Sequence, residues 1–233
     1  MAIYVDPTFQ AGRVSIRPLE FKDTNSGQLL GHYQAVTFSG AAASIGAGTA
    51  GILASLWWAD ATRYFVLTRL AIDIEVITAV TAAPLFDVQA FIFRGATGAS
   101  AGTGSSTLSL TGNNQKVRKN MGASLLSNGG ELRTFGTTTA LTAATGKTND
   151  AAPFGAAFLP MLNAVTATGT AVLLPVGAGT TCGWNDVYKL DNAYKHPIYL
   201  SEDEGIEIQT ITANNTTGTV KYGFLWEWAE VST

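Results

Sequence analysis

The stretch Val220-Lys221-Tyr222-Gly223-Phe224-Leu225-Trp226-Glu227-Trp228-Ala229 decides the fold. Large apolar side chains occupy every second position, and the positions between them are polar or small except for Leu225. A period of two places alternate side chains on opposite faces of an extended strand. The stretch therefore predicts a strand with one deeply buried face, and segments 69–76 and 86–93 repeat the pattern.

Residues 206–211 alternate in the same way and precede the segment Asn214-Asn215-Thr216-Thr217-Gly218. Such residues tolerate the backbone geometry of a turn. Two alternating runs joined by a turn segment are typical of a β-hairpin. We therefore expect 206–211 and 220–229 to pair with each other.

The chain shows no capped helical period, although residues 185–193 allow one or two helical turns. Short β-branched runs joined by Gly-rich segments favour an all-β sandwich or barrel. Residues 1–30 are polar and weakly periodic, and Pro and Gly interrupt them, which predicts an extended N-terminal arm. The remaining residues, 31–233, are expected to form a single β-sandwich domain with a long Gly/Ser/Thr-rich loop at 95–115.

Charged residues make up only 13% of the 233-residue chain, against about 25% in an ordinary soluble domain. They are absent from four blocks: Tyr33–Ala59, Gly95–Gln115, Thr134–Gly146 and Ala151–Asn185. Interface cores are depleted of charge because burying charged groups costs desolvation. The composition therefore favours an assembly protein, whose uncharged surface faces other protein, over an enzyme.

The overall charge and composition also argue against several partners and compartments. A net charge of −3 gives no basic patch for nucleic acid. Gly and Ser interrupt the uncharged block 33–59, so we expect no membrane span. The first residues lack the pattern of a secretory signal, and the lone Cys182 excludes an internal disulfide framework and suits synthesis in a reducing compartment.

Three glycine-containing motifs resemble catalytic or nucleotide-binding patterns. Residues 46–51 match the dinucleotide fingerprint, but no βαβ unit surrounds them. Residues 98–102 match a nucleophile elbow without a following helix, and only His32 and His196 are available as bases. Residues 146–148 resemble the end of a phosphate loop, yet Leu141 stands where that motif requires glycine. We expect no enzyme and no cofactor.

Acidic and aromatic clusters have structural interpretations that we favour. Glu202, Asp203 and Glu204 could hold calcium, but a solvated turn between strands explains them better. Neither histidine has a partner at metal-ligand spacing, so no metal site is expected. Trp57 and Trp58, together with Trp184, Trp226 and Trp228, could stack on sugars, although tryptophan more often fills a sandwich core or anchors an interface.

A series of short motifs runs in order from Arg17 to Trp228. It comprises Arg17-Pro18, Gly31-His32-Tyr33, 58–63, 110–118, Met121-Gly122, 196–200, 204–206 and Trp226-Glu227-Trp228. The ordered set resembles a group of tailed-phage virion structural proteins. Trp57 departs from their pattern, which has a polar or basic residue beside Trp58, and this leaves the orientation of the aromatic pair open.

The resemblance implies a virion protein without catalytic activity. The segment from Leu200 to Thr212 is also similar to the penultimate hairpin of jelly-roll trimers, which implies a jelly-roll-like antiparallel β-sandwich. The resulting hypothesis is a capsid decoration or cement protein on the head surface, made in the bacterial cytoplasm. It would form a homo-oligomer, a trimer by expectation, and bind the major capsid protein or other virion proteins.

The interface residues expected from this hypothesis lie in the arm, the aromatic pair and the loops. They are Tyr4, Arg17, Pro18, Trp57, Trp58, Asn113, Asn114 and Arg118. An alternative hypothesis is a tail or fibre receptor-binding module, in which Trp57, Trp58 and loop residues hold a glycan of the bacterial surface.

Overall fold

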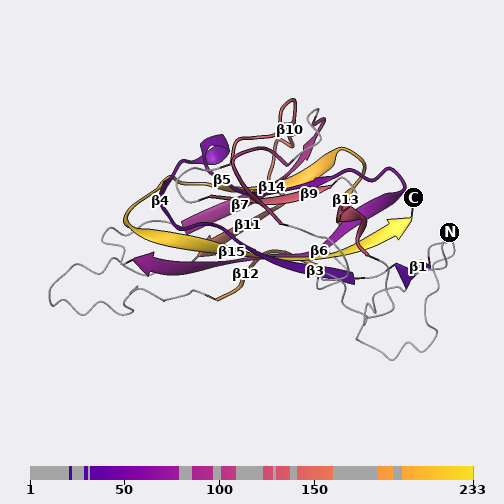
Figure 1. The fold of residues 1–233 in the computed structure, drawn as a ribbon, viewed down its shortest axis with the longest axis horizontal. Helices are drawn as coiled ribbons and strands as arrows, with labels where there is room; N and C mark the ends of the chain where they lie inside the picture. The colour runs from indigo at the N-terminus through magenta and orange to yellow at the C-terminus, as the bar shows by residue number, and fades with distance from the viewer. Residues whose placement is uncertain are drawn as a thin grey trace.

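The computed structural model describes residues 21–22, 29–30, 32–78, 86–96, 101–108, 123–127, 130–136, 141–159, 183–190 and 196–232. Residues 32–232 of this set form two antiparallel sheets that pack as a sandwich, and residues 21–22 and 29–30 form a separate two-stranded sheet. In Figure 1, β3, β6, β12 and β15 lie together in the lower half of the view, and β5, β7, β9 and β14 lie above them.

The first sheet, called the β15 sheet, has the strand order β12-β6-β15-β3. Its strands are β3 (His32–Phe38), β6 (Arg63–Thr78), β12 (Asn185–Lys189) and β15 (Asn214–Ser232), with β4 (Ala42–Ile45) on β15 and β13 (Ile198–Leu200) on β6. The second, called the β14 sheet, has the order β10-β7-β14-β5-β9-β8. Its strands are β5 (Ile52–Trp58), β7 (Phe86–Arg94), β8 (Ser105–Thr107), β9 (Glu131–Phe135), β10 (Thr148–Asn149) and β14 (Glu204–Thr210), with β11 (Gly155–Leu159) on β7.

The connectivity is that of a jelly roll. Strands β5, β6 and β7 alternate between the sheets, and so do β11 and β12, and β14 and β15. The last strand, β15, lies between β3 and β6, and β14 lies between β5 and β7. Four strands of each sheet, β12-β6-β15-β3 and β11-β7-β14-β5, interleave in this way and make the paired Greek keys of a jelly roll. The all-β, jelly-roll-like sandwich is therefore confirmed.

The expected hairpin between 206–211 and 220–229 is wrong. Strand β14 pairs with β5 and β7, whereas β15 pairs with β3, β4 and β6 in the opposite sheet. The chain crosses between the sheets at 211–213, and the expected turn at 214–218 is the bulged beginning of β15. Alternation shows which face of a strand is buried. It does not show the partner strand, because two strands that face each other across the core alternate in the same way as two strands that pair within one sheet.

Two smaller expectations are also corrected. Residues 185–189 form strand β12, so the helical turns expected there are wrong for that part. Within the expected loop 95–115, residues 105–107 form β8 at the edge of the β14 sheet.

Of the expected arm, the structure describes β1 (Phe21–Lys22) and β2 (Leu29–Leu30), which pair antiparallel; the other arm residues lie outside the described part.

The core lies between the sheets and is rich in aromatic rings. Val220, Tyr222, Phe224, Trp226 and Trp228 all have zero exposure, as the alternating pattern predicts. The Trp228 ring stacks on Tyr33 and Phe65, at centroid distances of 5.6 and 5.7 Å. Burying each large side chain contributes about 1.5–3 kcal/mol, so this one strand supplies a large share of the core.

Candidate interaction surface and buried polar networks

The outer face of the β15 sheet carries an exposed aromatic patch. Strand register places Phe38, Gly223 and Asp73 side by side on β3, β15 and β6. Asn185 pairs with Ile72, which puts Trp184 beside Asp73 at the fourth strand. The two aromatic residues thus lie in one row across the sheet.

Both rings lie against Gly223. A Cβ atom built on this glycine would be 3.2 Å from Phe38 Cε1 and 3.3 Å from Trp184 Cη2. The Phe38 side chain is 56% exposed and Trp184 is 42% exposed, whereas Gly223 is buried beneath them. We call Val36, Phe38 and Trp184, with Gly223 as their floor, the Phe38–Trp184 patch.

Charged side chains border this patch on two sides. On one side, Arg69 Nε donates to Asp186 Oδ1 at 2.6 Å, and Arg69 Nη1 lies 3.6 Å from Glu227 Oε1. On the other, Lys221 pairs in register with Glu75, and its Nζ lies 4.8 Å from the centroid of Phe38. The hydrogen bond to Asp186 is the main cause that raises the pKa of Arg69.

A matching arrangement on the outer face of the β14 sheet is closed. The ring of Phe93 covers Gly205, and Phe93 itself has zero exposure. A small second cluster seals it, formed by Trp57, Phe93, Ala96, Ala101 and Ala144. Thus Trp57 points away from the main core yet is only 5% exposed, and Trp58 points into the core with zero exposure.

A buried ion pair fastens segment 141–150 over that face. The Lys147 ammonium contacts the Glu207 carboxylate, which has zero exposure and also accepts a hydrogen bond from Asn149 Nδ2 at 3.2 Å. Lys147 Nζ lies 5.0 Å from the centroid of the Phe93 ring. Burial lowers the pKa of Lys147 to about 8. The pair binds a loop to a sheet, and the side chains of Lys147 and Glu207 are only 6% and 0% exposed.

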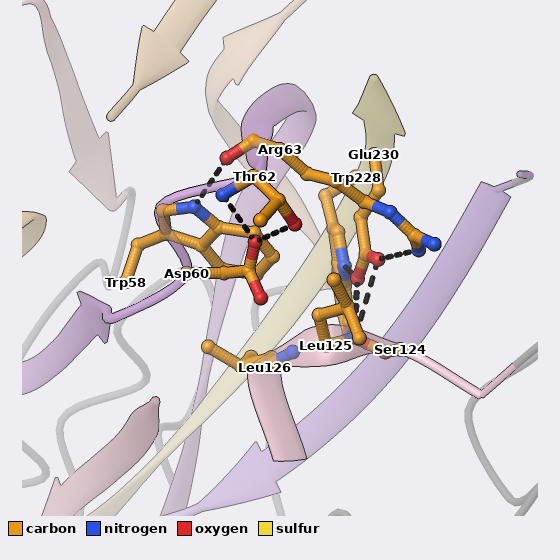
Figure 2. A network of polar contacts seen from close by, with 9 residues as sticks. All are labelled: Trp58, Asp60, Thr62, Arg63, Ser124, Leu125, Leu126, Trp228 and Glu230. Carbon is orange, nitrogen blue, oxygen red and sulfur yellow. Dashed lines mark hydrogen bonds and ion pairs between the residues drawn. The ribbon is translucent and has the colours of Figure 1, made fainter. Parts of the chain in front are cut away.

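The second buried network centres on Glu230 of β15, shown in Figure 2. Ser124 Oγ donates to its Oε1 at 2.5 Å, and the Leu125 N–H and Trp228 Nε1 donate at 3.1 and 3.3 Å. Arg63 Nη1 lies 3.5 Å from Oε2. These contacts tie the short turn η2 (Leu125–Ser127) to β15 and β6.

Burial raises the pKa of Glu230, while the hydrogen bonds from Ser124, Leu125 and Trp228 and the charge of Arg63 oppose that shift. The carboxylate has zero exposure and Ser124 is 5% exposed, so solvent does not reach either group. No histidine takes part in the contacts of Figure 2. The arrangement is suited to holding a segment in place.

The glycine-containing segment 46–51 and the acidic segment 202–204 each lead into a strand of the β14 sheet. Residues 46–51 lead through the turn η1 (Gly48–Ala50) into strand β5, where a dinucleotide fold would have a helix. Residues 202–204 form the turn into β14, as expected. Burial acts to raise the pKa of Glu204, but hydrogen bonds from Ser201 and Arg94 outweigh it and lower the pKa. Within the described residues, no three His, Cys, Asp or Glu side chains gather as metal ligands.

Of the expected interface residues, the structure describes the two tryptophans. Trp57 and Trp58 are buried within this chain, so neither indole offers an open face for a glycan. Tyr4, Arg17, Pro18, Asn113, Asn114 and Arg118 lie outside the described residues. Of the exposed aromatic residues, Trp184 was expected only as one of five tryptophans that could stack on sugars, and Phe38 was missed. Phe38 shares its strand phase with the polar Gln34, which is a signal of outward orientation.

Comparisons of the chain with protein-family models, with curated proteins and with solved structures give no match. Among the described residues, no helix has the length and apolar character that crossing a membrane requires.

Proposed function

We propose that the protein is a non-enzymatic structural protein of a tailed-phage virion, a decoration or cement protein that binds the assembled head. It would act as a homo-oligomer, with three chains expected, and stabilise contacts between capsid subunits. Binding to the assembled lattice in preference to free subunits would stabilise the shell by mass action.

The observation that carries this proposal is the uncharged character of exposed segments. In the block 33–59, residues 47, 49 and 50 are exposed outside the Phe38–Trp184 patch. In the block 151–185, residues 151–153 and 156 are exposed, and Phe158 on β11 reaches 76% exposure. Surface of this kind suits contact with protein, because no charge has to be desolvated.

The two buried polar networks agree with a structural role. Lys147 with Glu207 fastens a loop, and Glu230 with Ser124 fastens a turn, each inside a closed environment. A rigid sandwich with its connections fixed in this way can present the same surface repeatedly on a lattice.

Co-sedimentation with purified phage heads that lack the protein tests the proposal. The full chain is expected to pellet with heads and to saturate at a fixed ratio, and deletion of residues 1–30 is expected to weaken binding at least tenfold. A Phe158→Ser variant probes the uncharged surface of the sandwich in the same assay. Failure of the full chain to bind heads would overturn the proposal, and undiminished binding of the deletion would remove the arm from it.

A further inference from the structure

Both outer faces of the sandwich carry a glycine covered by aromatic rings, but the rings are buried on one face and exposed on the other. On each, aromatic rings cover a glycine of a central strand: Phe93 covers Gly205, and Phe38 with Trp184 covers Gly223. On the β14 sheet, Lys147 and the second cluster seal the ring from solvent. On the β15 sheet the rings stay 56% and 42% exposed, so the chain leaves this aromatic surface open.

The size of the open patch argues against a protein interface as its occupant. It extends over two outward rows along the strands and four strands across, so its area is on the order of 250 Å² from strand spacings. Each partner of a stable protein interface buries about 800 Å². Asp73 lies within the row, between Gly223 and Trp184, and Arg69 and Lys221 border the patch on its two sides, where an interface core would continue uncharged.

The chemistry of the patch suits a sugar ring. The face of an aromatic ring is negative, and it attracts the weakly positive C–H groups of a pyranose. Asp73 in the same row provides a carboxylate, as do Asp186 and Glu227, which Arg69 also contacts, and Lys221 provides a donor beside Phe38. An apolar platform with a few polar groups at its edge is the composition of small-molecule sites.

We propose that the Phe38–Trp184 patch binds a neutral oligosaccharide, with a pyranose ring stacked on Trp184 and hydroxyl groups bonded to the charged border. Phe38, whose ring lies 4.8 Å from Lys221 Nζ, forms the edge of the platform, and Gly223 leaves room for both rings above the sheet. The proposal is independent of whether the protein sits on the head, and it places sugar binding on residues other than the buried Trp57 and Trp58.

The test is a printed array of neutral oligosaccharides of glucose, galactose, mannose and N-acetylglucosamine, two to six units long, probed with the labelled full chain. The best ligand is then titrated by calorimetry. Binding of at least one oligosaccharide is expected, with the Kd raised at least tenfold in Trp184→Ala and raised less in Phe38→Leu. The matched control is Phe158→Ala, an exposed aromatic residue on the other sheet, with an expected change below twofold.

Thermal unfolding of each variant checks that the fold is kept, and light scattering records its native mass. Absence of binding to every oligosaccharide would overturn the proposal, as would an unchanged Kd in folded Trp184→Ala. A loss of native mass in Trp184→Ala without sugar binding by the wild type would identify the patch as a contact between copies. Head binding by co-sedimentation is measured separately, so this proposal can fail while the decoration role stands.

Discussion

Glu230 shows how a single buried residue can fix a connection in this fold. A carboxylate removed from water is costly unless charge and hydrogen bonds compensate it. Ser124, the Leu125 N–H, Trp228 and Arg63 supply that compensation from three separate parts of the chain. Removing the carboxylate would remove the acceptor that these buried donors share and the negative charge that faces Arg63.

Glu230→Ala is therefore expected to lower the free energy of unfolding by about 3 kcal/mol, the usual cost of breaking a buried pair. Glu227→Ala is the matched control, because Glu227 lies on the same strand but faces outward and is partly exposed. Its loss is expected to cost about 1 kcal/mol or less. Urea denaturation measures both, and equal costs would contradict the structural role of Glu230.

The raised pKa of Glu230 also predicts a pH dependence. Between its ordinary pKa and the raised native value, the folded state binds the proton more tightly than the unfolded state, so this group adds stability as pH falls. The neutral variant Glu230→Gln lacks that contribution. The free energy of unfolding of the wild type minus that of Glu230→Gln is expected to be larger at pH 4.5 than at pH 7.5. Chemical denaturation at each pH measures both values. A smaller difference at pH 4.5 would reverse the assigned direction of the shift.

Two glycines of central strands differ in how much space surrounds them. A Cβ atom on Gly205 would overlap Phe93 and the backbone carbonyl of Leu56, whereas on Gly223 it would meet only ring atoms at 3.2 Å or more. Gly205→Ala is expected to cost about 3 kcal/mol through overpacking, and Gly223→Ala less than half of that. Differential scanning calorimetry of the two variants tests this, and a comparable loss in both would show that the Gly205 site can adapt.

At the scale of elements, alternation predicted which residues are buried but not which strands pair. The five large residues of 220–228 are all in the core, as their period indicates. The pairing of β14 and β15 was wrong, because both present an apolar face to the same core from opposite sheets. Their true partners are set by contacts distant in sequence, and a local pattern contains no information about them.

The same limit applies to the candidate site. Trp57 and Trp58 are adjacent, so a strand must turn them to opposite faces, but only the loop 141–150 and its neighbours explain why the outward ring is also buried. The Phe38–Trp184 patch combines residues 146 positions apart, and register alone brings them into one row. No local spacing in the sequence could have shown it.

The buried ion pair makes a prediction about the segment that it holds. Lys147→Met would leave the Glu207 carboxylate buried without its cation, at an expected cost of about 3–5 kcal/mol. The segment 141–150 should then exchange amide hydrogens faster than in the wild type, measured by mass spectrometry, while the amides of β15 keep their relative protection. Lys221→Met, which removes a lysine from the open sheet face, is the control. Unchanged exchange in 141–150 would show that the pair does not hold the segment.

At the scale of the whole molecule, the fold class followed from composition and period. Alternating strands without capped helices indicated a sandwich, and the strand order makes it a jelly roll. Because the chain contains few charged residues, some of its exposed segments are uncharged, and such segments favour contact with other protein.

The most direct test of the proposed role on the head is electron microscopy of virions labelled with an antibody against this chain. The decoration role predicts label spread over the head at many positions. Label confined to the tail or to a single vertex would contradict it.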